Sequence, residues 1–173
     1  MNNFVMGIDP GVKGSLCIID PGDDYNIIHH SSWNTLKNKK KTKAITSINR
    51  AIDVYKNYIY PALTNWDDDI SNVIIELPAL IHNPSTYGLQ CYNVATLISN
   101  LLLEESHFYF KLGLISPSDW SRICGSDTVA YTIDKGLSLP TVKWKRETVA
   151  DSYCIARTGA ILAGKNKLRS VTQ

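Results

Sequence analysis

The sequence opens with two apolar runs joined by a short turn that carries an acid. Residues 3–8 form the first run, "DPGVKG" follows at 9–14, and "SLCIID" resumes the apolar pattern at 15–20. Proline and glycine in so short a connection favour a tight turn, which predicts an antiparallel β-hairpin. A carboxylate at the end of a buried strand is costly unless something compensates its charge. Asp9 is therefore interpreted either as a cap for this turn or as part of a charged site.

The rest of the chain alternates between helical and strand patterns. Six further elements are expected, at residues 25–33 (strand), 44–63 (helix), 72–77 (strand), 89–103 (helix), 108–116 (strand) and 145–164 (helix). A short helix is also expected after Pro117, whereas the pattern of residues 126–141 is ambiguous. This order predicts an α/β fold with a mixed five-stranded sheet, in which three antiparallel strands are followed by parallel strands, flanked by helices.

Length and composition indicate one globular domain over residues 1–173, because no repeat or flexible linker interrupts the chain. The four cysteines are far apart and form no CxxC pair or zinc-ligand spacing, so reduced core thiols are expected. The first residues lack a basic segment followed by an apolar one, which favours the cytoplasm of a cell or of a virus's host, with an organelle as the alternative. Pro84 and Gln90 interrupt the longest uncharged stretch, so no membrane partner is expected.

Three acidic residues lie at the ends of expected strands or on the last expected helix. Asp9 ends the first strand, Glu76 lies at the end of the fourth, and Asp151 lies on the last helix, one turn after Glu147. If the first and fourth strands are neighbours, Asp9 and Glu76 come side by side and raise each other's pKa. Carboxylates are ligands for hard divalent cations, so this pattern predicts a site for Mg²⁺ or Mn²⁺, with two ions expected.

Three segments of the chain resemble motifs of a known family. "GIDPGVKG", "VIIELP" and "ETVADSYCIA" are similar to the first, second and last acidic motifs of RuvC-type Holliday junction resolvases, which belong to the RNase H-like superfamily. The order of strands and helices is also similar over nearly the whole chain. The resemblance implies that Asp9, Glu76 and Asp151 are metal ligands of a phosphodiesterase that leaves a 5′-phosphate and a 3′-hydroxyl.

The last motif departs from the pattern of that family. Many relatives carry an acid or a histidine three residues before the final aspartate, where this chain has Thr148. Glu147 lies on the same helical face as Asp151 and is one candidate for the fourth metal ligand, while the threonine could instead hold a metal-bound water. An ordinary first-turn glutamate facing the helix dipole is the alternative interpretation of Glu147.

Basic and aromatic residues near these motifs are candidate DNA contacts, although any one of the basic residues could be an ordinary solvated charge. The net charge is only +2, but five lysines crowd into "KNKKKTK" at residues 37–43. Lys135 is a candidate catalytic residue that would stabilise the transition state, and Trp120 is either a core residue or a DNA contact. The DNA-binding candidates are Lys37, Lys39, Lys40, Lys41, Lys43, Tyr87, Lys143, Lys145 and Arg146, with Tyr87 expected to stack on an unpaired base.

The leading hypothesis is a divalent-metal-dependent endonuclease that resolves four-way DNA junctions as a homodimer, without a small-molecule cofactor. A nuclease acting on other branched DNA or on an RNA:DNA hybrid is the first alternative. A noncatalytic junction binder is the second, although such a protein would be expected to have lost one of the acids. An actin-like ATP-binding domain fits poorly, because the chain has neither a second domain nor a second glycine-rich phosphate loop.

Overall fold

A computed structural model describes residues 3–35, 44–66, 69–79 and 84–171 of the chain. Its centre is a six-stranded sheet with the strand order β3-β2-β1-β4-β5-β6. The strands are β1 (Phe4–Asp9), β2 (Lys13–Asp20), β3 (Asn26–Asn34), β4 (Ile70–Glu76), β5 (Lys111–Ile115) and β6 (Arg169–Ser170). The predicted five-stranded mixed sheet is therefore confirmed, and the two-residue β6, which pairs antiparallel with β5, extends it by one short edge strand.

The register of the central strands brings the first two acids to the same edge of the sheet. β1 runs antiparallel to β2 and parallel to β4, with Ile8 opposite Ile75. One residue further along each strand come Asp9 and Glu76, where β1 and β4 both end. Because parallel strands end on the same side of a sheet, the fold aligns these two side chains.

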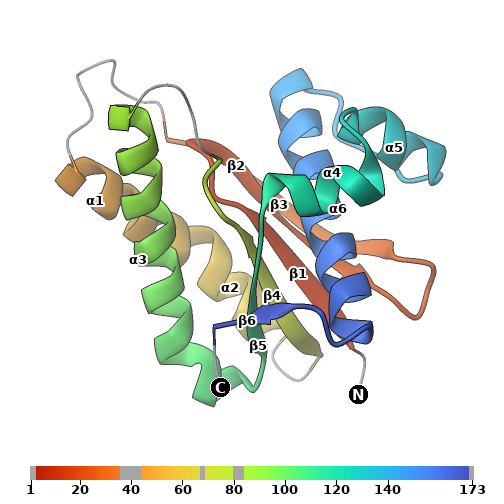
Figure 1. Ribbon diagram of the computed structural model, residues 1–173, viewed down its shortest axis with the longest axis horizontal. Coiled ribbons are helices and arrows are strands. Elements are labelled where there is room, and N and C mark those ends of the chain that lie inside the picture. Colours follow the sequence, from red (N-terminus) through yellow and green to blue (C-terminus); the bar gives the residue numbers. More distant parts are fainter. Residues whose placement is uncertain (1–2, 36–43, 67–68, 80–83, 172–173) are drawn as a thin grey trace.

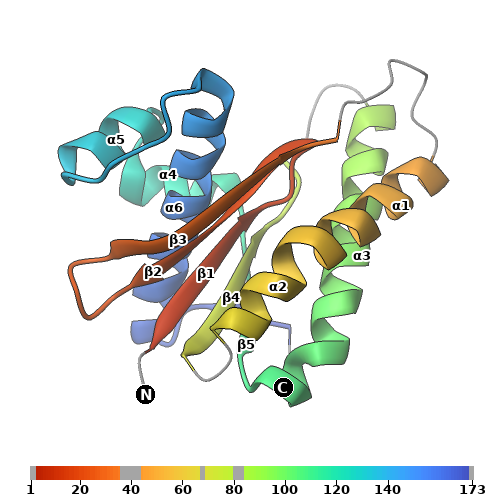
Figure 2. The same cartoon turned by 180° about the vertical axis from the view of Figure 1, so that it is seen from behind.

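Helices cover both faces of the sheet (Figures 1 and 2). One face carries α1 (Ala44–Val54), the π-helix η1 (Tyr55–Ile59), α2 (Tyr60–Asn65) and α3 (Pro84–Phe108). The other face carries α4 (Pro117–Cys124), α5 (Thr128–Asp134) and α6 (Lys143–Gly164). Each helical layer encloses its own apolar core, because alternate residues of every strand point to opposite faces: Ile8 packs on the α1–α3 side and Val5 on the α6 side.

Local structure differs from the expected elements at two places. The helix expected over residues 44–63 is interrupted by the π-helical turn η1, so that it becomes α1, η1 and α2. The ambiguous segment 126–141 contains α5, which begins after Asp127, whose carboxylate accepts a hydrogen bond from the amide of Ala130 at 2.9 Å. This side-chain cap is a local signal for a helix start.

The last helix, α6, lies directly against β1 and β2. A methyl group at Gly7 of β1 would collide with the Ser152 carbonyl and the Ala156 amide, so only glycine allows α6 to approach this closely. The Ser15 hydroxyl on β2 donates a 2.6 Å hydrogen bond to the carbonyl of Thr148 and lies 2.8 Å from the Ser152 hydroxyl. These contacts fix the height of α6 over the sheet and thereby the position of Asp151.

Within the described ranges, no helix combines the length and the apolar character needed to cross a lipid bilayer.

Candidate active site

The turn after β1 holds Asp9 at its base. The Asp9 Oδ1 atom accepts a hydrogen bond from the Gly11 amide at 3.0 Å, so the capping role expected from the sequence is present. The Trp33 indole of β3 donates to the Gly11 carbonyl at 3.0 Å, and Asn93 of α3 donates to the Pro10 carbonyl. The turn is thus tied to two other elements, which fixes the backbone beneath the carboxylate.

Glu76 and Asp151 each accept a hydrogen bond from a neutral side chain. The Trp120 indole of α4 donates to Glu76 Oε1 at 2.6 Å. The Thr128 hydroxyl, at the start of α5, donates to Asp151 Oδ1 at 2.6 Å. Carboxylates from β4 and α6 are therefore both held by the α4–α5 segment.

Burial, together with repulsion from neighbouring carboxylates, raises the pKa of all three acids. The pKa of Asp9 lies well above its usual value, because the group is desolvated and the charges of Glu76 and Asp151 are close by. Burial likewise raises the pKa of Glu76, with a further contribution from Asp151, although the Trp120 hydrogen bond opposes the shift. Among the described residues, none of these three carboxylates forms an ion pair, so their negative charge is uncompensated.

Of the three acids, Asp151 is the one whose pKa responds to the charge of the fourth carboxylate, Glu147. Its charge contributes to raising the pKa of Asp151, after the larger effect of burial and against the Thr128 hydrogen bond. Glu147 is exposed and lies 3.9 Å from the Lys143 ammonium, one helical turn away. Thr148, the alternative at this position, is buried and donates its hydroxyl to the Lys145 carbonyl of its own helix at 3.2 Å. The Glu147 carboxylate is thus the group of the two that is open to a ligand.

The chemistry of these donors fits a hard divalent cation. All four side chains offer carboxylate oxygens, and three of them are partly desolvated and lack a counter-ion. In the described parts of the chain, no three His, Cys, Asp or Glu residues lie close enough to one another to hold a metal ion as they stand. A bound cation would therefore have to draw these carboxylates closer together.

Two hollows open beside the acids. One of about 160 Å³ lies between the β1 turn and α3 and is lined by Asp9, Glu76, Gln90 and Asn93. The other, of about 650 Å³, lies between α5 and the start of α6. Its lining residues are Ser126, Asp127, Thr128, Val129, Arg146, Glu147 and Asp151. Solvent and a ligand can therefore reach Asp9 and Glu76 through the first hollow, and Glu147 and Asp151 through the second.

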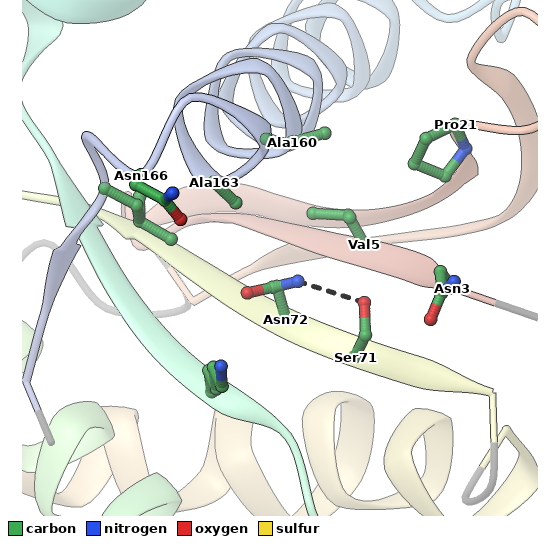
Figure 3. Close-up of a pocket in the computed structure, with 11 residues that line it drawn as sticks. Asn3, Val5, Pro21, Ser71, Asn72, Ala160, Ala163 and Asn166 are labelled. Atoms are coloured by element: carbon green, nitrogen blue, oxygen red, sulfur yellow. Dashed lines mark hydrogen bonds between the residues drawn. The ribbon is translucent and has the colours of Figure 1, made fainter.

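A third hollow, of about 590 Å³, is formed by other residues (Figure 3). Asn3, which precedes β1, lies at its rim, together with Asn72 near the start of β4 and Asn166 after α6. The Asn72 amide donates to the Ser71 hydroxyl at 3.0 Å, so part of its polar lining is already hydrogen-bonded. None of the four candidate acids borders this hollow.

Comparisons with known proteins identify the architecture. No protein-family model matches the sequence, and no curated protein matches it. A solved structure of Thermus thermophilus RuvC in complex with a Holliday junction substrate, by contrast, is similar with a TM-score of 0.69 at 14% sequence identity. The similarity covers 98% of this chain and 99% of that one. The fold is that of RuvC.

Two further structures share the RuvC-like fold. A second Thermus thermophilus RuvC structure has a TM-score of 0.68 at 14% identity and covers 97% of this chain and 99% of its own. The yeast mitochondrial Holliday junction resolvase Ydc2 has a TM-score of 0.61 at 19% identity, covering 91% and 77% respectively. The RuvC-like architecture expected from the acidic motifs is thereby confirmed at the level of the fold.

The RuvC-like fold brings some of the basic candidates to the acids and leaves others apart. Arg146 lines the same hollow as Asp151 and Glu147, and Lys143 pairs with Glu147. Lys145 lies over the Trp144 ring, 5.7 Å from its centroid. Lys135 follows the far end of α5, where its ammonium lies 5.7 Å from the Tyr131 ring centroid, with no described contact to the acids.

The remaining DNA-binding candidates belong to the α3 side of this RuvC-like fold or to undescribed segments. Tyr87 lies in the first turns of α3, where a hydrogen bond with the Cys91 side chain raises the pKa of its phenol. The lysines expected to contact phosphate at 37, 39, 40, 41 and 43 lie outside the described residues.

Three neighbours of the acids were not expected from the sequence. Thr128 lies in the segment with an ambiguous pattern, and Asn93 carried no motif. Trp120 was expected to be either core or a DNA contact; it packs against the core on the α6 side, and its indole N–H also donates to Glu76, which the sequence did not indicate. A tryptophan or threonine one helix away from an acid gives no local signal, because the contact exists only once α4 and α5 have packed on α6.

Proposed function

We propose that this chain is a divalent-metal-dependent endonuclease that resolves four-way DNA junctions by paired phosphodiester hydrolysis, leaving 5′-phosphate ends. The observation that carries the proposal is the convergence of Asp9, Glu76 and Asp151 from three elements, with raised pKa values and no counter-ion among the described residues. The RuvC-like fold supports it, because one of the similar RuvC structures holds a Holliday junction substrate.

In this proposal Asp9, Glu76 and Asp151 hold Mg²⁺ or Mn²⁺, and Glu147 supplies the fourth carboxylate. Two such ions would activate the attacking water and stabilise the leaving oxygen of the phosphodiester. The protein contributes a fixed turn beneath Asp9 and neutral donors to Glu76 and Asp151, which would keep the carboxylates oriented for the cations.

Basic residues beside this site would bind the DNA backbone. Arg146 borders the hollow that contains Asp151, so its guanidinium can contact a phosphate next to the one that is cut. Lys143 and Lys145 extend the same positive surface at the start of α6. The lysines at 37, 39, 40, 41 and 43 are proposed as a second backbone contact, Tyr87 as a base-stacking residue and Lys135 as a stabiliser of the transition state.

We also propose that residues 1–173 act as a single nuclease domain and that two copies act together on one junction. The near-complete overlap with the RuvC chain supports the first point. The second follows from symmetry, because a four-way junction offers two related strands to two related sites. Leu103 and Tyr92 of α3, which are 78% and 51% exposed, offer apolar surface for such a dimer.

A cleavage assay on three matched substrates tests the proposal. A four-way junction, a linear duplex and an RNA:DNA hybrid of the same sequence are incubated with Mg²⁺ or with chelator. We expect symmetrically paired nicks on the junction alone, only with the metal, and none from Asp9→Asn, which should still bind the junction. Cleavage of the hybrid or of the linear duplex in place of the junction would show that the proposed substrate is wrong, while the nuclease activity would stand. Binding without cleavage under every condition would overturn the enzymatic proposal.

A further inference from the structure

The α4–α5 segment reaches two carboxylates that belong to different parts of the fold. Trp120 lies in the middle of α4 and donates to Glu76 at the end of β4. Thr128 opens α5 and donates to Asp151 in the middle of α6. Both donor–acceptor distances are 2.6 Å, which is usual for a hydroxyl bonded to a carboxylate and short for an indole N–H. One short stretch of chain therefore sets the orientation of two of the three half-buried acids.

Among the described residues, each of the three carboxylates accepts a hydrogen bond through one of its two oxygens. The described hydrogen bonds engage Oδ1 of Asp9, Oε1 of Glu76 and Oδ1 of Asp151. Within the described residues, the second oxygen of each carboxylate has no hydrogen-bond partner. An oxygen held by a donor fixes the plane of the carboxylate, while the other oxygen stays available to a cation.

The two donors carry no charge, so the carboxylates that they orient can still bind a cation. A lysine or arginine in place of Trp120 or Thr128 would neutralise the acid and repel a cation. An indole N–H or a hydroxyl instead orients the carboxylate and leaves its full negative charge in place. The arrangement therefore favours capture of a positive ligand over pairing inside the protein.

The donors are themselves held in position. α4 begins with a capping box, in which the Ser116 amide donates to Asp119 at 2.7 Å. The Thr128 carbonyl accepts a 2.7 Å hydrogen bond from the buried Thr132 hydroxyl one turn later. Both helices pack against α6, so the backbone that carries each donor is held in place relative to the helix that carries Asp151.

We propose that Trp120 and Thr128 are positioning residues that present the free oxygens of Glu76 and Asp151 to a divalent cation. The inference rests on the proposed function in one respect, because the cation is the one that the nuclease would use. It goes beyond that proposal by naming two residues outside the acidic motifs on which metal affinity depends.

Metal binding, measured without any DNA, tests this proposal. The free-Mn²⁺ signal in electron paramagnetic resonance is titrated with the purified full chain and with four variants. Thr128→Val keeps the shape of the side chain and removes the hydroxyl, whereas Thr128→Ser restores it. Trp120→Phe removes the indole N–H, and Trp144→Phe is its matched control, since Trp144 is a half-buried tryptophan of α6 with no described hydrogen bond to an acid.

We expect Thr128→Val and Trp120→Phe each to weaken Mn²⁺ binding about tenfold, with Thr128→Ser and Trp144→Phe close to the original protein. Thermal unfolding in chelator separates this effect from general destabilisation, because a purely structural role would lower the melting temperature without changing the affinity of the folded protein. Two variants on different helices keep the test decisive if one of them fails to fold.

The outcomes distinguish this inference from the proposed function. If the original chain binds Mn²⁺ and both donor-deletion variants bind it equally well, the positioning role is wrong while the nuclease proposal stands. If the original chain binds no Mn²⁺ at millimolar concentration, the proposal of a metal-dependent nuclease and the proposal of a positioning role are both wrong. Loss of affinity in the deletion variants with recovery in Thr128→Ser supports both.

Discussion

The Ser15 hydroxyl of β2 donates a 2.6 Å hydrogen bond to the Thr148 carbonyl of α6, across a sequence separation of 133 residues. Both residues are buried, and the bond joins the hairpin that carries Asp9 to the helix that carries Asp151. We expect Ser15→Ala to lower the free energy of unfolding by about 1 kcal/mol, because a buried hydrogen bond is lost while the fold is kept. Urea denaturation measures this change.

Thr35→Ala is the control for Ser15→Ala. The Thr35 hydroxyl also donates to a backbone carbonyl, that of Val12, but at the exposed end of the hairpin. Its removal should change stability by less than Ser15→Ala does, because water can replace an exposed partner. Equal effects of the two substitutions would contradict the role given to the buried bond.

Gly7 is predicted to tolerate no larger residue. A methyl group there would collide with the Ser152 carbonyl and the Ala156 amide, both of which are helix backbone and cannot rotate away. Gly7→Ala should therefore lower the free energy of unfolding by about 1–3 kcal/mol or more, as overpacked cores do.

Gly88→Ala provides the matched comparison for Gly7→Ala. Gly88 lies inside α3, and an added methyl group meets nothing within 4 Å. Alanine is the better helix former by about 1 kcal/mol, so this variant should be neutral or stabilised. If the denaturation curves of the two variants coincide, the stability of the fold does not depend on the close approach of α6 to β1.

Repulsion among the acids predicts a pH-dependent gain from Asp9→Asn in the metal-free protein. The folded state raises the pKa of Asp9, through burial first and the neighbouring carboxylates second, so folding favours the protonated form. The original chain therefore loses stability as the pH rises from about 4, the ordinary pKa, through the raised value. In chelator, the stability difference between Asp9→Asn and the original chain should be smallest near pH 4 and grow toward neutral pH.

Thermal unfolding at several pH values measures this difference, with Asp53→Asn as a control on the exposed surface of α1. Because the Asp53 side chain is exposed, that substitution should change stability at neutral pH by less than Asp9→Asn does. Adding Mn²⁺ should stabilise the original chain and reverse the advantage of Asp9→Asn, because a cation compensates the repulsion that the substitution removes. A constant difference across the pH range would show that repulsion at Asp9 does not limit stability.

Arg146 is predicted to contact a phosphate through the hollow that it shares with Asp151. Arg146→Gln should weaken junction binding and reduce the slope of log Kd against log salt concentration by about one, the contribution of one phosphate contact. Fluorescence anisotropy over a range of salt concentrations, in chelator to prevent cleavage, measures this slope. Lys56 is an exposed lysine of η1 on the opposite helical layer, so Lys56→Gln should leave the slope unchanged. Identical slopes for the two variants would show that Arg146 does not contact the DNA backbone.

The sequence predicts those parts of the site that depend on local signals. Asp9 is marked by a strand and a proline-glycine turn, and Glu76 by a β-branched run ending at a proline, so their meeting follows once β1 and β4 pair. Trp120 and Thr128 could not be assigned, because their contacts depend on how α4 and α5 pack. The strand β6 also escaped prediction, since two residues carry no periodicity and their pairing depends on where α6 ends.

The last prediction separates the two candidates for the fourth metal-binding position. The Glu147 carboxylate is exposed beside Asp151, whereas the Thr148 hydroxyl is bonded to the Lys145 carbonyl at 3.2 Å. Under the proposed function, Glu147→Gln should reduce metal-dependent cleavage of a junction about tenfold or more and raise the Mn²⁺ concentration needed for half-maximal rate. Thr148→Val, which removes only the hydroxyl, should change the metal requirement little. Single-turnover cleavage across Mn²⁺ and Mg²⁺ titrations gives both quantities, and a larger change in Thr148→Val than in Glu147→Gln would assign the position to the threonine.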